Sequence, residues 1–276
     1  MSFEITGIPS SFRVPITAAE IIMGQGASNA PLGARYALYV AAKLAASGTA
    51  TVATIYEVGS ESEAATLFGF GSPAHRCARM HLRANKNGKL YINSYLPSSG
   101  GSPAAATATL TIANTATGTG VFKVVVCGEE IDVGYKTGDT VTVMGDALAA
   151  KVNALRHLPV SASNSTGTVT ITSKIMGASQ NSVHRIRVVS VTAGTAVTVT
   201  ASAALLASGA DGTTTELTNF QAALDAMTAS AQYYLACPVT VSTFVAALKA
   251  HVATKNEPNP GIFCKGMVVS TGALAA

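Results

Sequence analysis

The feature that most constrains the fold is a change of pattern along the chain. Strand signals alternate with helix signals before residue 101 and again after residue 211, whereas the region between them contains mostly short strands. Alternation of this kind predicts an α/β layer, and a run of strands predicts a separate β-rich unit. We therefore expect an α/β domain, residues 21–100 and 212–276, interrupted by an inserted β-rich (α+β) domain, residues 101–211.

Local signals predict where the individual elements lie. Ser60 followed by Glu63 is a capping box, and Ser72 before Pro73 is an N-cap with proline at the first helical position. We expect the second of these helices to end at Asn87-Gly88. The other predicted helices are 141–155, 216–227 and 241–253, and the predicted strands are 35–42, 51–58, 89–96, 109–112, 121–126, 130–135, 168–173, 185–191, 196–201, 233–238 and 262–269.

The first 20 residues predict an extended arm rather than a helix. Pro9 and Pro15 each remove a backbone donor and push the preceding residue toward extended geometry. The apolar side chains around them follow no helical period. We expect this extended arm to bind another surface. Its candidate contact residues are Ile5, Ile8, Pro9, Phe12, Arg13, Val14 and Pro15.

Composition excludes several classes of protein. Charged residues make up 12% of the chain and hydrophobic residues 48%, which does not fit a disordered protein. The four cysteines form no C-x-x-C pair, so reduced thiols in a cytosolic setting fit better than a zinc site or a disulfide framework. The charge-free run 188–210 contains many Ser, Thr and Gly residues, and we interpret it as strands rather than a membrane span. No signal peptide is expected, since Glu4 stands where basic residues would be needed.

The motif search gives no active site. Residues 69–74 match G-x-G-x-x-A, but a helix rather than a strand precedes them, and no acid follows at the distance a ribose contact needs. We interpret Gly69 and Gly71 as a tight turn between two helices. The histidines show no metal-ligand spacing, and no nucleophile motif occurs. We expect no enzyme activity, no cofactor and no metal.

Basic residues are concentrated in one part of the chain. Arg76, Arg79 and Arg83 share one helical stripe, and the stretch 64–128 contains six basic residues and no acidic one. The whole chain carries only +4, so the remainder is net negative. This asymmetry fits a charged contact between subunits. A solvated helix face is the plain alternative, and the aromatic residues of a nucleic-acid surface are missing.

The order of these pieces resembles the contractile-phage tail sheath proteins of the Mu-like type. The resemblance is carried by four collinear stretches, 8–15, 65–92, 118–155 together with 171–189, and 220–252. It implies a structural subunit that assembles with copies of itself around a tail tube protein and contracts to drive the tube through the host envelope. It further implies contacts with a baseplate and a tail terminator, a place in the virion tail, and assembly in the host bacterial cytoplasm.

In that family the terminal arms add strands to neighbouring subunits, so the resemblance implies that residues 5–16 bind another copy. Sheath chains usually continue further, and we expect this chain to lack the C-terminal portion. The alternative is a non-contractile tail or baseplate component that uses the inserted domain as a binding module. An α/β enzyme using the turn at residues 69–72 is the least favoured hypothesis. Membrane insertion and nucleic-acid binding are not expected.

Overall fold

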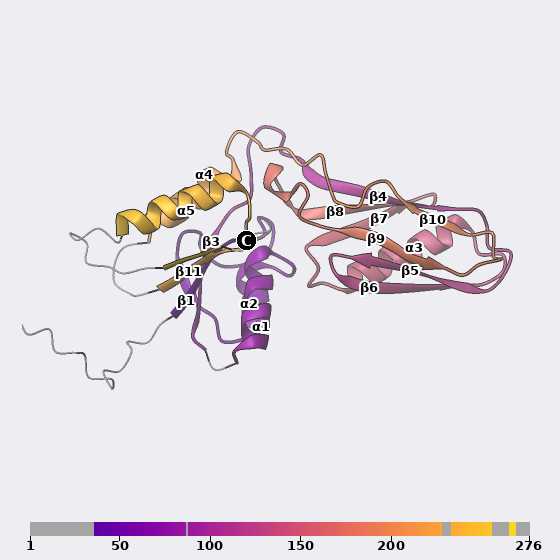
Figure 1. Cartoon of the computed structure of the whole chain (residues 1–276), viewed down its shortest axis with the longest axis horizontal. Coiled ribbons are helices and arrows are strands. Elements are labelled where there is room, and N and C mark those ends of the chain that lie inside the picture. The colour runs from indigo at the N-terminus through magenta and orange to yellow at the C-terminus, as the bar shows by residue number, and fades with distance from the viewer. Residues whose placement is uncertain (1–35, 87, 228–232, 256–264, 269–276) are drawn as a thin grey trace, which may run out of the picture. The chain divides into compact units, whose positions relative to one another are not determined.

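A computed structural model describes residues 36–86, 88–227, 233–255 and 265–268 (Figure 1). The arm residues Ile5, Ile8, Pro9, Phe12, Arg13, Val14 and Pro15 lie outside the described residues. The described chain combines five α-helices with three sheets of five, four and three strands, so it is a mixed α/β structure as predicted.

The five-stranded sheet joins segments from both ends of the described chain. Its order is β12-β11-β1-β3-β2, and all neighbours are parallel except β2, which runs antiparallel to β3. Register is continuous along β1, with Leu38 opposite Tyr91 on one side and Leu235 on the other. The strands are β1 Tyr36–Ala42, β2 Ile55–Glu57, β3 Leu90–Tyr95, β11 Tyr233–Cys237 and β12 Lys265–Val268.

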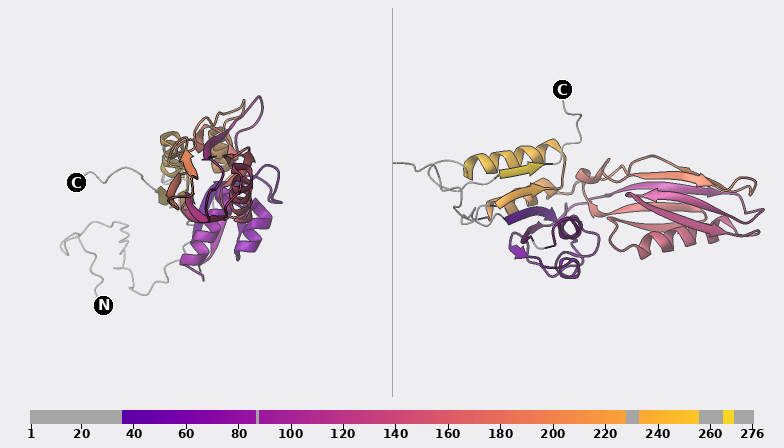
Figure 2. Two further views of the ribbon diagram at one scale, coloured as in Figure 1. Left: turned by 90° about the vertical axis from the view of Figure 1, so that its right-hand side faces the viewer. Right: turned by 60° about the horizontal axis from the view of Figure 1, so that its bottom comes forward.

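Two pairs of helices cover this sheet. The right-hand view of Figure 2 shows α1 (Glu61–Phe68) and α2 (Pro73–Ala84) on one side, and α4 (Glu216–Asp225) and α5 (Ser242–Lys255) on the other. The two sides have separate cores. One core lies between the sheet and the pair α4 and α5, where Phe220, Phe244 and Leu248 of the helices pack with Leu38 and Leu235 of the strands. The other core contains Ala41, Phe68, Ala74, Ala78, Leu90 and Ile92.

The helices begin where the local signals predict. The Ser60 hydroxyl accepts a hydrogen bond from the Glu63 amide at 3.1 Å, and the Glu63 carboxylate accepts one from the Gly59 amide at 2.9 Å. The Ser72 hydroxyl accepts from the His75 amide at 3.0 Å, with Pro73 as the first helical residue. These bonds satisfy amides that a helix start leaves without a backbone partner.

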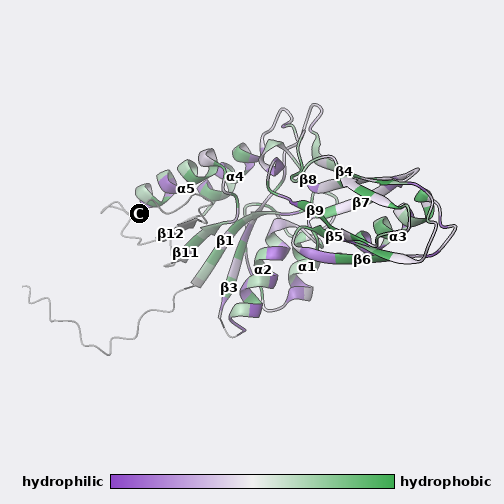
Figure 3. Cartoon of the chain, turned by 45° about the vertical axis from the view of Figure 1, so that its right-hand side comes forward, coloured by the Kyte–Doolittle hydropathy of each residue, from purple (hydrophilic) through white to green (hydrophobic). Residues whose placement is uncertain are grey.

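Residues 105–201 form two antiparallel sheets of their own. The sheet orders are β10-β4-β8-β7 and β6-β5-β9, and α3 (Val141–Ala154) packs with both sheets through its buried Met144, Leu148 and Val152. Hydrophobic and polar residues alternate along these strands, as Figure 3 shows by colour. The strands are β4 Ala105–Ala113, β5 Gly120–Val126, β6 Glu129–Tyr135, β7 Val160–Ser165, β8 Thr168–Met176, β9 Ile186–Val191 and β10 Thr198–Ala201.

Two local expectations are wrong, and one strand was not expected. The strand expected over 51–58 is reduced to β2, because Ala53 adopts a positive φ of 56° that breaks extended geometry. The α2 helix ends at Ala84 with Asn85 as its C-cap, before the expected stop at Gly88. Strand β7 was not predicted, since Val160–Ser165 has the sequence VSASNS and no clear apolar alternation.

Candidate functional site

The basic stripe of α2 divides into exposed and paired members. Arg76 and Arg83 are exposed, whereas the side chain of Arg79 is 16% exposed and its Nε lies 3.3 Å from Oε1 of Glu61 on α1. Sequence reasoning missed this partner because Glu61 lies just before the acid-free stretch. Arg79 therefore links two helices of its own chain, and Arg76 and Arg83 are the members available to another molecule.

An apolar residue lies between the two exposed arginines. Met80 is 70% exposed, and it follows Arg76 by four residues and precedes Arg83 by three, so the three side chains share one face of α2. An exposed methionine flanked by guanidinium groups can contact a partner that offers both apolar surface and carboxylates. No sequence signal separates Met80 from the rest of the helix.

The turn between α1 and α2 is structural. Gly69 and Gly71 have φ values of 86° and 81°, and the Gly71 amide donates to Nδ1 of His75 at 3.3 Å. The G-x-G element follows helix α1 rather than a strand, so it does not form a dinucleotide site. Burial lowers the pKa of His75, whereas the nearby Glu61 partly raises it, so the imidazole is favoured in its neutral form.

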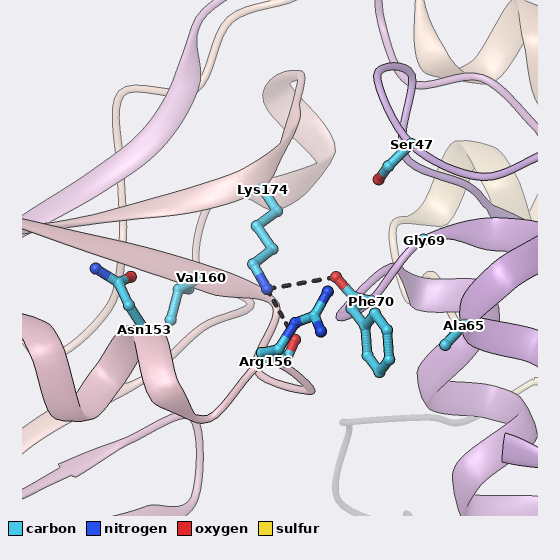
Figure 4. A pocket seen from close by; sticks show the side chains of 8 residues that line it. All are labelled: Ser47, Ala65, Gly69, Phe70, Asn153, Arg156, Val160 and Lys174. Carbon is cyan, nitrogen blue, oxygen red and sulfur yellow. Dashed lines mark hydrogen bonds between the residues drawn. The ribbon is translucent and has the colours of Figure 1, made fainter. Parts of the chain in front are cut away.

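This turn is fastened to the region after α3 (Figure 4). Lys174 on β8 donates from Nζ to the backbone oxygen of Arg156 at 2.9 Å and to that of Phe70 at 3.3 Å. The Arg156 guanidinium carbon lies 4.0 Å from the centroid of the Phe70 ring. A cavity of about 310 Å³ opens here, lined by Ser47, Ala65, Gly69, Phe70, Asn153, Arg156, Val160 and Lys174.

A second connection is a buried polar network around Glu216. This residue is 1% exposed, and its Oε1 accepts a hydrogen bond from the Tyr95 hydroxyl at 3.1 Å. Its Oε2 accepts from the Ser179 hydroxyl and, at 3.5 Å, from the Gln180 side-chain amide. Burial raises the pKa of Glu216, and the donated hydrogen bonds oppose that rise. Glu216 thus joins β3, α4 and the short 3₁₀ helix Ala178–Gln180.

The remaining titratable groups form no metal-binding cluster within the described part of the chain. No three His, Cys, Asp or Glu side chains there converge as metal ligands would. His157 lies 3.2 Å from Glu129, and Lys123 pairs with Glu130 at 3.0 Å and with Asp132 at 3.1 Å. Among the described helices, none has the length and apolar character needed to cross a membrane.

Sequence comparison identifies a relative. The Mu-like prophage FluMu tail sheath protein of Haemophilus influenzae is 30% identical to this chain over 184 residues, which is 66% of this chain. This chain is similar in sequence to a Mu-like tail sheath protein. The resemblance inferred from the sequence is thereby confirmed. The aligned part covers 37% of the Haemophilus protein, so the chain spans little more than a third of that relative.

No protein-family profile matches the chain. A crystal structure of the sheath tail protein from Listeria innocua aligns with 84% of this chain and 47% of its own length, at 15% identity and a TM-score of 0.30.

Proposed function

We propose that this chain is a structural subunit of a contractile phage tail sheath. In this role it assembles with copies of itself around a tail tube, meets the baseplate and tail terminator, and contracts to drive the tube through the host envelope. The observation that carries the proposal is the 30% identity to a tail sheath protein over 184 residues. The role needs no catalytic group and no cofactor, and it places the protein in the virion tail after assembly in the host cytoplasm.

The proposed domain organisation follows the topology. Residues 21–100 and 212–276 form one α/β domain, residues 101–211 an inserted domain, and residues 1–20 an arm. Support comes from the sheets, because β1–β3 share a sheet with β11 and β12 while β4–β10 form two others. In a sheath, an inserted domain of this kind projects outward, and the α/β domain carries the lattice contacts.

The arm is proposed to join neighbouring copies by adding a strand to one of their sheets. Its support is the sequence, in which Pro9 and Pro15 bracket the apolar Phe12 and Val14. The second proposed contact is the arginine stripe. The exposure of Arg76 and Arg83 supports it, whereas Arg79 contributes mainly by holding α2 against α1.

Electron microscopy of the purified protein, alone and with tail tubes added, tests the proposal. We expect rings or tubes from the wild type, loss of assembly on deletion of residues 1–18, and the same loss in a Phe12→Asp/Val14→Asp variant. A charge placed in an apolar groove without a partner is strongly unfavourable. The matched control is Ser10→Asp/Ser11→Asp, which adds equal charge at polar positions of the same arm.

Two results would count against the proposal. If the wild type assembles under no salt condition, even with tubes present, the sheath role fails and a binding module of the tail or baseplate becomes the better hypothesis. If the Phe12→Asp/Val14→Asp variant assembles normally, the sheath role stands but the arm is not the linker.

A further inference from the structure

The cavity beside Lys174 and Arg156 has the character of a ligand site. Its volume of about 310 Å³ lies at the lower end of the range for small-molecule pockets. Its walls come from the α1–α2 turn, from α3 and the residues after it, and from β7 and β8. In Figure 4, Lys174, Arg156 and Phe70 lie together near the centre of the view, and Ser47 lies apart from them, above Gly69.

Within the described ranges, neither cationic group at this cavity pairs with a carboxylate. The two hydrogen bonds of Lys174 Nζ go to backbone oxygens, and Arg156 lies on the face of the Phe70 ring. Among the residues that the structure describes, no aspartate or glutamate forms an ion pair with either side chain. Two neighbouring positive charges therefore meet at one cavity without a counter-ion from the described part of the chain.

The surroundings of Lys174 weaken its charged form. Burial lowers the pKa of Lys174, and the nearby Arg156 lowers it further. An anion in the cavity would oppose both effects. The donors for it are also present, because an ammonium group has three N–H bonds and Lys174 uses two of them on carbonyls.

We propose that this cavity binds a small oxyanion, a phosphate or carboxylate group, between the ammonium group of Lys174 and the guanidinium group of Arg156. The Phe70 ring holds Arg156 in place while the N–H edge of its guanidinium group stays available, and such an edge matches two oxygens of a phosphate or carboxylate. The Ser47 hydroxyl, which also lines the cavity, is a further donor. The site joins the α1–α2 turn to the residues after α3, so the bound anion fastens these segments together.

The oxyanion has two sources that share this chemistry, a free ion in solution or an Asp or Glu carboxylate of a second copy. We would titrate inorganic phosphate into dilute, unassembled protein at constant ionic strength, with chloride as the balancing ion, and follow the backbone NMR signals of residues 69–71 and 156. Saturable shifts support a free anion. Shifts that appear only as protein concentration rises support a carboxylate of a second copy.

Variants make the assignment specific. Arg156→Gln keeps the backbone oxygen that accepts the hydrogen bond from Lys174, so this contact remains while the guanidinium group is lost. We expect the variant to bind phosphate at least about tenfold more weakly. Lys174→Gln removes the second donor and serves as an independent variant. Lys249→Gln, an exposed lysine of α5 outside the cavity lining, is the matched control and should bind as the wild type does.

The proposal is overturned if neither added phosphate nor a rise in protein concentration shifts the NMR signals of these residues in a saturable way. It is also overturned if Lys249→Gln weakens the response as much as Arg156→Gln does. Because the phosphate arm uses unassembled protein, it stands or falls separately from the sheath role.

Discussion

The hydroxyl group of Tyr95 donates a hydrogen bond to the carboxylate of Glu216 at 3.1 Å, across 121 residues of chain. Both side chains are about 1% exposed, and the Tyr95 ring packs edge-on against Phe220 at 5.5 Å between centroids. Burial disfavours the charged form of this carboxylate, because water no longer stabilises its charge.

The first prediction concerns pH. Burial raises the pKa of Glu216 above its ordinary 4.5, so the folded state binds more protons there than the unfolded state. The stabilising contribution of the protonated group is complete below pH 4.5 and is lost as pH rises through the raised pKa. We therefore expect Glu216→Gln, which stays neutral, to remove a decline in the free energy of unfolding as pH rises above 4.5.

Urea denaturation of the wild type and Glu216→Gln at several pH values measures this difference. Buried histidines whose pKa is lowered, such as His184 at about 4, change stability in the opposite direction but do so in both proteins. Parallel pH profiles of the two proteins would contradict the prediction.

The second prediction concerns the α1–α2 turn. A Cβ at Gly71 would lie 2.2 Å from the backbone oxygen of Leu158, and its φ of 81° is strained for any other residue. We expect Gly71→Ala to lower the free energy of unfolding by roughly 1–3 kcal/mol or more, from backbone strain plus the clash. Gly134→Ala is the control, since a Cβ there meets nothing within 4 Å. Equal stabilities of the two variants in chemical denaturation would show that the turn relaxes freely.

The third prediction concerns the core between the sheet and α4 with α5. Phe220 is fully buried and contacts Phe244 at 5.1 Å between ring centroids. Phe220→Ala removes those contacts and leaves a cavity, so we expect a loss of about 3–5 kcal/mol in the free energy of unfolding. Met80→Ala, at a 70% exposed position, should change it by less than about 0.5 kcal/mol. Thermal or urea unfolding of both variants measures these changes in the free energy of unfolding. A loss below about 1 kcal/mol for Phe220→Ala would be inconsistent with this core.

The fourth prediction separates the roles of two arginines. Arg79→Glu places two carboxylates together at Glu61, so we expect about 0.5–1 kcal/mol of destabilisation in the isolated protein. Arg76→Glu changes an exposed position and should leave the unfolding transition unchanged while weakening assembly in a salt-dependent way. Sedimentation at low and high salt reports assembly. If Arg76→Glu assembles like the wild type at every salt concentration, Arg76 is part of a solvated helix face.

The fifth prediction concerns thiol reactivity. Burial raises the pKa of Cys77 and Cys237 to about 12 and that of Cys127 to about 11, so all three stay protonated at pH 8. We expect slow alkylation of these residues by iodoacetamide in the folded protein and fast alkylation in urea, measured peptide by peptide by mass spectrometry. Rapid native labelling of Cys77 would show that α2 opens from the sheet.

Much of the secondary structure could be predicted because its causes are local. The caps at Ser60 and Ser72 act within three residues, and the apolar period of 141–155 matches α3 almost to the residue. Strand β7 could not be predicted in this way. Its small polar residues become a strand through pairing with β8, and the Asn153 side chain bonds both the amide and the carbonyl of Ala162 at its other edge.

The sequence by itself determined the element boundaries set by caps, turns and periodicity, the basic stripe of α2, and the likeness to tail sheath proteins. Only the tertiary structure decided which arginines of that stripe are available to a partner, since Arg79 forms an ion pair with Glu61. It also decided that Lys174 reaches Phe70 and that Glu216 reaches Tyr95, over sequence separations of 104 and 121 residues. Caps and periodic faces depend on neighbours within a few residues, whereas a buried charge takes its partner from whichever distant segment the packed core brings beside it.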